Sequence, residues 1–352
     1  MPSQPPQSGS FEFIEVQLHE IEQPLEKGLA FERLCVKYLK SAPRYRDRFK
    51  KVWHFRDWPG NWGIDKGVDL IAETHSGELW SIQAKAYGED WSISKRDIDS
   101  FLSDSNRPEI SYRLLIATTD NIGRNANETI ENQEKDVFTC LKGNLVQEEV
   151  VWPASLTKAF KALPKKKPRD HQKAAIDDVL KGFKTNKRGQ MIMACGTGKT
   201  LAALWINERL KSRRTLVLVP SLSLVSQMLD EWNRNSKAKF ETLVVCSDET
   251  VLRRGDDLPV ASSTTLGIPV TTEPDEIRRF LRKKREAPAV VFCTYQSSDR
   301  IAQAQTKGVP SFDLVIADEA HRCARRVVPL PRKHVGPSLP IGRTRCRLDL
   351  SA

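Results

Sequence analysis

Several features that define other protein classes are missing from this sequence of 352 residues. No stretch approaches the roughly 18 uninterrupted apolar residues that a membrane span needs. The N-terminal segment MPSQPPQSGS has neither a positive region nor an apolar core, so it is not a secretory signal. The seven cysteines are never spaced as CxxC, which disfavours a disulfide framework and a zinc site. These absences predict a cytoplasmic protein with reduced thiols, no membrane partner and a disordered lead-in over residues 1–12.

Positive charge is plentiful but unevenly distributed. The net charge is +11, and residues 322–352 contain eight Arg or Lys against one Asp, so this segment contributes +7 and the rest of the chain +4. Basicity alone is therefore a weak indicator of a nucleic-acid partner. Because the end of the chain also contains four prolines and little apolar periodicity, we predict an irregular basic tail over residues 326–352.

Composition divides the chain into two segments, each long enough to bury its own core. Residues 13–143 mix helical patterns with strand-like runs such as YRLLIATT, which predicts an α/β sandwich. The composition changes over residues 144–168, which contain the charged run PKKKPR, and we place a linker there. Residues 169–325 alternate short apolar runs with helical stretches, which predicts a doubly wound parallel sheet.

The segment GVDLIAETHSGELWSIQAKAY, residues 67–87, predicts a β-hairpin whose second strand places Gln83 and Lys85 on one face. With a three-residue loop, residues 75–77, Asp69 pairs with Gln83 and the three polar side chains converge. With a two-residue Ser-Gly loop, Asp69 lies on the opposite face. Carboxylate and amide oxygens suit Mg²⁺, and a neighbouring lysine orients or deprotonates an attacking water. Convergence therefore predicts metal-dependent phosphodiester hydrolysis, with Asp69 and Gln83 as metal ligands.

Four motifs, KGLAFERL, GIDKGVDL, IQAKAY and IATTDNIGRNA, follow one another between residues 20 and 140. In this order they resemble the PD-(D/E)xK nuclease superfamily, most closely its Mrr-like restriction endonucleases. The resemblance implies a restriction-endonuclease-like α/β sandwich that cuts double-stranded DNA with Mg²⁺. The residues that it assigns to the catalytic site are Asp69, Gln83, Lys85 and Glu32. Gln83 replaces a second acid, so the helix acid Glu32 is expected to compensate for the lost charge, with Asp65 as a weaker candidate.

Five tryptophans crowd this segment, namely Trp53, Trp58, Trp62, Trp80 and Trp91. Aromatic side chains stack on DNA bases in some nucleic-acid-binding proteins. They also contribute large buried areas to cores wherever they occur. The sequence favours core packing for these five.

The segment MACGTGKT, residues 193–200, follows an apolar run and precedes a helical stretch, as a phosphate-binding loop requires. Its glycines allow backbone N–H groups to surround the β-phosphate, Lys199 reaches the β and γ oxygens, and Thr200 supplies a hydroxyl to Mg²⁺. The loop residues expected to bind ATP are Gly196, Thr197, Gly198, Lys199 and Thr200. FDLVIADEAH predicts a strand ending in two acids, of which Asp318 holds Mg²⁺ through water and Glu319 polarises the attacking water.

Together with RDHQ, residues 169–172, these motifs resemble DEAH-type helicases of superfamily two, particularly the translocating subunits of type I and type III restriction enzymes. The resemblance implies a RecA-like lobe in which Gln172 reads adenine, Arg169 supports it, and His321 couples the nucleotide to neighbouring motifs. The segments VPSLSLVSQ and CTYQS match those that touch the nucleic-acid backbone. The DNA contacts implied there are Ser221, Thr294 and Gln296.

The motor motifs depart from the helicase pattern after His321. Such helicases use a second RecA-like domain with arginine fingers, and no Ser-Ala-Thr motif follows here. We therefore expect a truncated or frame-shifted reading of a longer restriction enzyme, without C-terminal helicase, methyltransferase and target-recognition parts. ATP would bind, but hydrolysis and translocation would be crippled, because arginine fingers contribute roughly a thousandfold or more.

The expected function is a Mg²⁺-dependent DNA endonuclease coupled to an ATP-binding helicase lobe, as in single-polypeptide restriction enzymes. Two alternatives stay open. The nuclease acts without ATP as a modification-dependent endonuclease, or the chain is a non-catalytic DNA-binding remnant.

Overall fold

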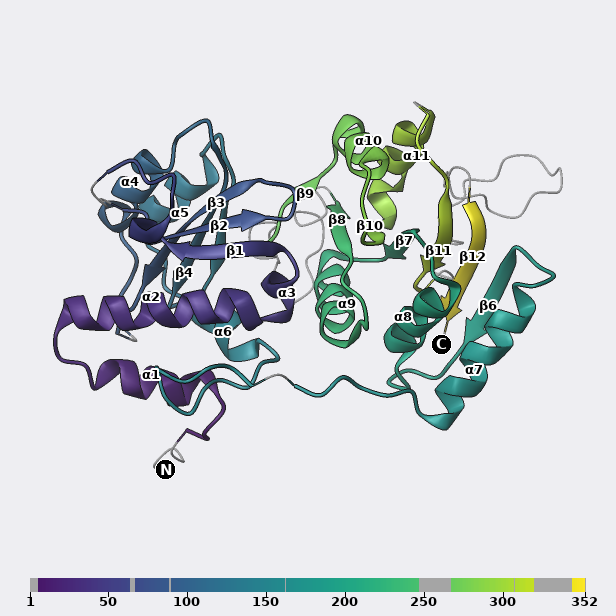
Figure 1. Ribbon diagram of the computed structural model, residues 1–352, viewed down its shortest axis with the longest axis horizontal. Helices are drawn as coiled ribbons and strands as arrows, with labels where there is room; N and C mark the ends of the chain where they lie inside the picture. Colours follow the sequence, from purple (N-terminus) through teal and green to yellow (C-terminus); the bar gives the residue numbers. More distant parts are fainter. Residues whose placement is uncertain are drawn as a thin grey trace. The chain divides into compact units, whose positions relative to one another are not determined.

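Two compact units make up the chain (Figure 1). The computed structural model describes residues 6–63, 67–88, 90–161, 163–246, 267–306, 308–319 and 344–351. Unit 1 comprises Met1–Pro164 with Thr264–Ile268, and unit 2 comprises Lys165–Ser263 with Pro269–Ala352. In the ranges just given, we find no helix with the length and apolar content that crossing a membrane requires.

A five-stranded sheet in the order β1-β2-β3-β4-β5 forms the centre of unit 1. The strands are β1 (Phe49–His54), β2 (Leu70–Thr74), β3 (Leu79–Lys85), β4 (Ile110–Ala117) and β5 (Val137–Cys140). The pairs β1-β2 and β2-β3 are antiparallel, whereas β3-β4 and β4-β5 are parallel. The last five residues of β4 are all buried, as expected of a parallel strand covered on both faces.

Helices cover both faces of this sheet, which confirms the α/β sandwich (Figure 1). The helices packed on one face are α1 (Phe11–His19), α2 (Pro24–Ser41), α3 (Pro43–Arg46) and α6 (Lys142–Gln147). Those on the other face are α4 (Lys95–Asp104) and α5 (Arg124–Glu131). Pro24 begins α2, because its ring fits the first helical position, where no N–H is needed.

Trp80 on β3 is the largest fully buried side chain in the described part of unit 1. It is fully buried, and its ring centroid lies 5.4 Å from that of Phe49, 5.0 Å from Tyr112 and 5.3 Å from Phe138. Truncating a buried aromatic side chain leaves a cavity, so we expect Trp80→Ala to lower the free energy of unfolding of unit 1 by about 3–5 kcal/mol. Urea denaturation followed by circular dichroism measures this loss.

The matched control for this prediction is Trp91→Ala, which removes a side chain that is 53% exposed. A surface substitution of this kind is expected to change the free energy of unfolding by about 0.5 kcal/mol or less. Equal losses in the two variants would contradict the packing role of Trp80.

The segment predicted as a linker, residues 144–168, packs on the core of unit 1 from Leu145 to Phe160. Trp152 is 3% exposed and stacks on Tyr38 with ring centroids 5.5 Å apart, and Phe160 packs against both rings. Val151 and Lys161 form an antiparallel bridge. The predicted start of the linker is therefore wrong, because the apolar residues of this segment complete the core on the α1-α2 side of unit 1.

Unit 2 is built on a seven-stranded sheet in the order β6-β12-β11-β7-β10-β8-β9, in which every neighbouring pair is parallel. The strands are β6 (Arg188–Ile192), β7 (Arg214–Val219), β8 (Glu241–Val245), β9 (Val270–Thr271), β10 (Ala289–Thr294), β11 (Phe312–Ala317) and β12 (Thr344–Ser351). This arrangement confirms the doubly wound parallel sheet.

Helices lie on both faces of the second sheet (Figure 1). They are α7 (Asp170–Gly182), α8 (Lys199–Leu210), α9 (Leu222–Asn235), α10 (Pro274–Arg282) and α11 (Ser298–Thr306). Val291 packs with Ile277 of α10, whereas Phe292, the next residue of β10, contacts Trp232 of α9. Because successive side chains of a strand point to opposite faces, α10 and α9 cover opposite sides of the sheet.

The expectation of an irregular tail over residues 326–352 is wrong for its last part. Residues 344–351 form β12, which lies between β6 and β11, whereas residues 326–343 are outside the described ranges. Leu348 and Leu350 are fully buried, and Arg347 pairs with Asp349 at 2.7 Å. This short alternation fits a strand, but the cations and prolines of the longer segment obscured it.

Candidate active sites

The hairpin in unit 1 has the three-residue loop, which settles the question of its register. Gly77 has φ +88°, and the Thr74 N–H donates to the Glu78 carbonyl at 2.9 Å. Leu70 pairs with Ile82, so the same register continues to Asp69 opposite Gln83. The sequence prediction that Asp69 and Gln83 meet across the two strands is therefore supported by the backbone geometry.

The polar atoms of this pair suit a divalent cation. An Asp69 Oδ2 accepts a hydrogen bond from the Ala84 N–H at 2.7 Å. Gln83 is 1% exposed, its Nε2 donates to the Gly67 carbonyl at 3.1 Å, and its buried Oε1 has no hydrogen-bond partner among the described residues. A buried oxygen without a partner is costly unless something else satisfies it. A hard cation that prefers oxygen ligands would do so.

The number of protein ligands at this position would be small. Among the described residues, no group of three or more His, Cys, Asp or Glu side chains could hold a metal ion. One carboxylate and one amide oxygen fit Mg²⁺, which usually keeps several waters and binds through few protein groups. The remaining coordination positions would then be open to water and phosphate oxygens.

Lys85 ends β3, two residues beyond Gln83, and lies near a tyrosine and an aspartate that the sequence analysis did not single out. The Tyr87 hydroxyl interacts electrostatically with the carboxylate of Asp97, at the start of α4. Burial, and then the Asp97 charge, raise the pKa of Tyr87, so its hydroxyl stays a donor. Burial works to raise the pKa of Asp97, but hydrogen bonds from Ser94 and the Lys85 charge lower it overall.

The signal for Asp97 was present in the sequence as the capping box Ser94-x-x-Asp97. This motif places a carboxylate in the first turn of α4 and ties it to Ser94 by hydrogen bonds of 2.8 and 2.7 Å. What the motif does not indicate is that the loop after β3 brings Tyr87 to the same carboxylate.

Glu32 lies on α2, and its carboxylate Oε2 is 3.6 Å from the Nδ1 of His54, which pairs with Leu70 of β2. The charges of Asp69 and Glu32 both reach the Cys35 thiol, whose pKa is raised first by burial. Because both carboxylates act on the same thiol, Glu32 lies in the neighbourhood of Asp69. The catalytic role of Glu32 stays a prediction. Asp65 lies outside the described residues.

The phosphate-binding loop of unit 2 joins β6 to α8. Gly196 and Gly198 have φ of +75° and +85°, and α8 begins at Lys199, so its first N–H groups face the loop. Gln172 is 4% exposed, donates through Nε2 to the Thr197 carbonyl at 2.9 Å, and accepts from the Arg169 N–H at 2.8 Å. The structure thus uses the Gln172 amide to hold the loop, and the reading of adenine by Gln172 stays a prediction.

Gly198 tests the geometry of this loop. An alanine Cβ at this position would overlap the Gln172 Nε2, and its φ lies in the left-handed region. A non-glycine residue held there costs about 1–3 kcal/mol. We therefore expect Gly198→Ala to weaken ATP binding by roughly 5- to 150-fold in a titration with a fluorescent ATP analogue.

The control for this substitution is Gly182→Ala, at the end of α7, where an added Cβ meets no atom within 4 Å. This variant is expected to bind the nucleotide as the unaltered chain does. Wild-type affinity in Gly198→Ala would show that the loop relaxes without loss.

The two acids predicted after β11 lie at the edge of the sheet that carries the loop. Asp318 donates its N–H to the Leu218 carbonyl at 2.8 Å and accepts from the Tyr295 hydroxyl at 2.7 Å through its own carbonyl. Glu319 has φ +50°, and its N–H donates to the Asp318 Oδ1 at 3.1 Å. Since β6 and β11 are parallel and separated only by β12, their carboxyl ends share one edge. Thr200, the other predicted ligand of this Mg²⁺, is held by its backbone carbonyl, which accepts from the Trp232 Nε1 at 3.0 Å. The predicted role of its hydroxyl stays a prediction.

The three residues predicted to contact DNA in unit 2 differ in exposure. Thr294 is fully buried and its hydroxyl donates to Ser297, so the prediction that its side chain contacts DNA is wrong. Ser221 caps α9 and accepts from the Leu224 N–H at 3.4 Å, whereas Gln296 is exposed. Ser221 and Gln296 stay predictions. His321 lies outside the described residues.

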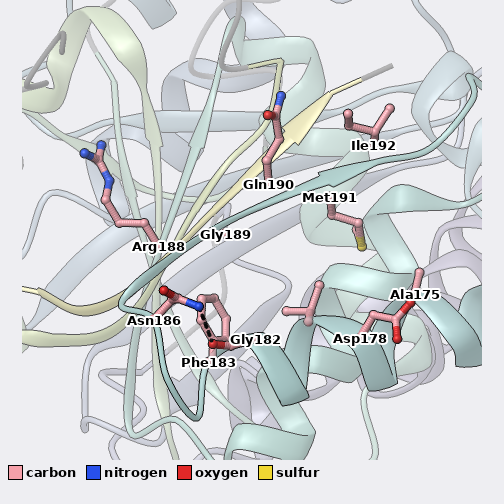
Figure 2. Close-up of a pocket in the computed structure, with 11 residues that line it drawn as sticks. Ala175, Asp178, Gly182, Phe183, Asn186, Arg188, Gly189, Gln190, Met191 and Ile192 are labelled. Carbon is pink, nitrogen blue, oxygen red and sulfur yellow. Dashed lines mark hydrogen bonds between the residues drawn. The ribbon is translucent and has the colours of Figure 1, made fainter.

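A groove of about 360 Å³ lies between α7 and β6 (Figure 2). Its walls include Phe183 from the end of α7 and Met191 from β6. None of the residues predicted to bind the nucleotide lines it, so this groove is separate from the phosphate-binding loop.

Both units match known families. Residues 40–161 match a family described as restriction endonuclease, and residues 165–339 match one described as type III restriction enzyme, res subunit. A protein of African swine fever virus (isolate Tick/South Africa/Pretoriuskop Pr4/1996), named "Probable helicase A859L", is 33% identical over 168 residues, which are 47% of this chain and 17% of the viral protein.

One similar solved structure is described as the ATP-dependent Type ISP restriction-modification enzyme LlaBIII bound to DNA. It is 29% identical, with a TM-score of 0.79 over 96% of this chain and 22% of that chain. The present chain thus spans less than a quarter of the length of LlaBIII and of the viral protein.

Proposed function

We propose that this chain cleaves DNA with Mg²⁺ and binds ATP. It joins a restriction endonuclease domain to a superfamily-two helicase domain, as in Type ISP restriction enzymes. The observation that carries the nuclease proposal is the buried Gln83 Oε1, without a described partner, opposite Asp69 and next to Lys85 on one strand. Burying an oxygen without a partner is costly, and a bound cation would offset that cost.

In this proposal Asp69 and Gln83 hold the metal ion. The Ala84 N–H orients the Asp69 carboxylate, and the Gly67 carbonyl orients the Gln83 amide by accepting from Nε2. Both ligands are therefore positioned before DNA binds, which lowers the entropy that binding costs. Bound Mg²⁺ supplies a Lewis acid for the phosphate.

Lys85 acts on the same phosphodiester from the end of β3. Its Nζ orients the attacking water, or accepts a proton from it, and offsets the negative charge that develops on the pentavalent phosphate. Asp97, in the first turn of α4, lies close enough to Lys85 for the two charges to interact. Glu32 completes the proposed set from α2.

In unit 2 the loop from Gly196 to Thr200 binds the phosphates of ATP. Lys199 contacts the β and γ oxygens, Thr200 and Asp318 serve the accompanying Mg²⁺, and Glu319 faces the attacking water. The N-terminus of α8 adds backbone N–H groups and the positive end of the helix dipole.

The test is cleavage of plasmid DNA with Mg²⁺, with and without ATP, for the unaltered chain and for variants of Lys85 and Lys199. We expect EDTA to stop cleavage and added Mg²⁺ to restore it. Retained DNA binding without cleavage in several divalent metals and on several substrates would instead identify a non-catalytic DNA-binding remnant.

A further inference from the structure

The eight tryptophans of the chain all lie in the described ranges, and Trp91 is the one among them that is exposed. Trp80 is buried, whereas Trp53, Trp58 and Trp62 are partly buried against the core on the α4-α5 side of the sheet. Trp91 is 53% exposed. Core packing therefore accounts for four of the five tryptophans of this segment and leaves Trp91 without an explanation.

One face of the Trp91 ring is already covered. It stacks on Tyr87 with ring centroids 5.6 Å apart and an interplanar angle of 16°. The Tyr87 ring is in turn partly buried against the core on the α4-α5 side of the sheet. The pair therefore forms a two-ring platform whose outer surface belongs to Trp91.

The backbone that carries the platform is held at both ends. Thr118 Oγ1 accepts from the Tyr87 N–H and donates to the Tyr87 carbonyl, each at 2.8 Å. The Thr119 hydroxyl donates to the Trp91 carbonyl at 2.9 Å, and the Trp91 N–H donates to the Gly88 carbonyl at 3.1 Å. An exposed ring that is held this firmly is preorganised for a flat partner, because little entropy is lost when the partner binds.

The platform stands next to the proposed nuclease centre. Tyr87 follows Lys85 by two residues, which span at most about 7 Å along an extended chain. The centroid of the Trp91 ring lies 5.6 Å from that of the Tyr87 ring. The outer face of Trp91 is therefore within the length of a few nucleotides of Lys85, since stacked nucleotides rise about 3.4 Å each.

We propose that the outer face of Trp91 stacks on a nucleobase that has left its base pair beside the scissile phosphate. Within a duplex both faces of each base are covered by neighbouring bases, so a side chain stacks only on a base outside the helix. Such stacking tolerates every sequence because every base has an aromatic face. Trp91 is then a positioning residue, and this inference rests on the proposed nuclease function.

The experiment uses the full chain and a DNA duplex that contains one unpaired 2-aminopurine, whose fluorescence falls when it stacks on an aromatic ring. Ca²⁺ replaces Mg²⁺ during binding, because it also takes oxygen ligands. We expect the unaltered chain to quench the probe and Trp91→Ala to lose the quenching and bind this DNA roughly 10-fold more weakly. Trp91→Phe is expected to recover part of the quenching.

The controls separate this inference from the nuclease proposal and from misfolding. Leu25→Ala, which alters a side chain that is 76% exposed on α2, is expected to quench as the unaltered chain does. Lys85→Ala is expected to quench but not to cleave in Mg²⁺. Quenching by Trp91→Ala equal to that of the unaltered chain would overturn the stacking role. Full cleavage by Lys85→Ala would overturn the nuclease centre instead.

Discussion

Lys85→Ala is expected to reduce Mg²⁺-dependent DNA cleavage by roughly 10²- to 10⁴-fold. A lysine side chain contributes about this much when it orients the water or offsets charge in the transition state as an ammonium, or when it accepts a proton from the water as a neutral amine. Lys85 stands at the end of β3 in register with Ala117 of β4, so the neighbouring strand fixes its backbone. The measurement is the single-turnover rate of plasmid cleavage with enzyme in excess.

The matched control is Lys50→Ala on β1, which removes a lysine that is 53% exposed and pairs with Glu73 of the neighbouring strand. A surface pair of this kind contributes about 0–1 kcal/mol to stability, and we expect no change in cleavage. Circular dichroism and DNA binding of Lys85→Ala are expected to match those of the unaltered chain. Full cleavage by this variant would falsify the nuclease assignment.

Lys199→Ala is expected to weaken ATP binding by roughly 10- to 150-fold, because a hydrogen bond to a charged group contributes about 1.5–3 kcal/mol. Lys199 is the first residue of α8, directly after the left-handed Gly198, so its side chain starts at the phosphate-facing end of the helix. Equilibrium titration with a fluorescent ATP analogue measures the loss.

The control for this variant is Lys184→Ala, an exposed lysine just after α7. It is expected to bind the analogue normally. The same pair of variants also distinguishes the two catalytic hypotheses. If ATP-dependent movement is needed for cleavage, Lys199→Ala cleaves poorly, whereas unchanged plasmid cleavage would favour an endonuclease that acts without ATP.

Local patterns predicted most of the secondary structure and the position of both candidate sites. The apolar run LVIA before Asp318 predicts a strand, and the glycines at residues 196 and 198 predict a phosphate-binding loop. Neither prediction depends on a contact with a distant part of the chain. The hairpin depended on one further choice, the length of its loop. Gly77 in the left-handed conformation makes that choice, since glycine adopts positive φ at no steric cost.

Burial could not be predicted in the same way. Thr294 ends an apolar strand, as a contact residue would, but β7 and β8 pair with β10 on its two sides, and its hydroxyl donates to Ser297. Gln172 has the sequence position of a base-reading side chain, yet the loop at Thr197 uses its amide. In both cases a residue distant in sequence or a neighbouring strand decides which groups the side chain meets.

Periodicity, glycine positions and residue order are properties of the chain itself, and they predict two α/β units, a hairpin that carries Asp69, Gln83 and Lys85, and a phosphate-binding loop. The exposure of a side chain depends instead on what packs against it. Trp80 and Trp91 look alike in the sequence, but the sheet and its helices enclose the first, while the loop held by Thr118 leaves the second open on one face. Tertiary packing alone made that distinction, because buried area is a property of neighbours and not of the residue.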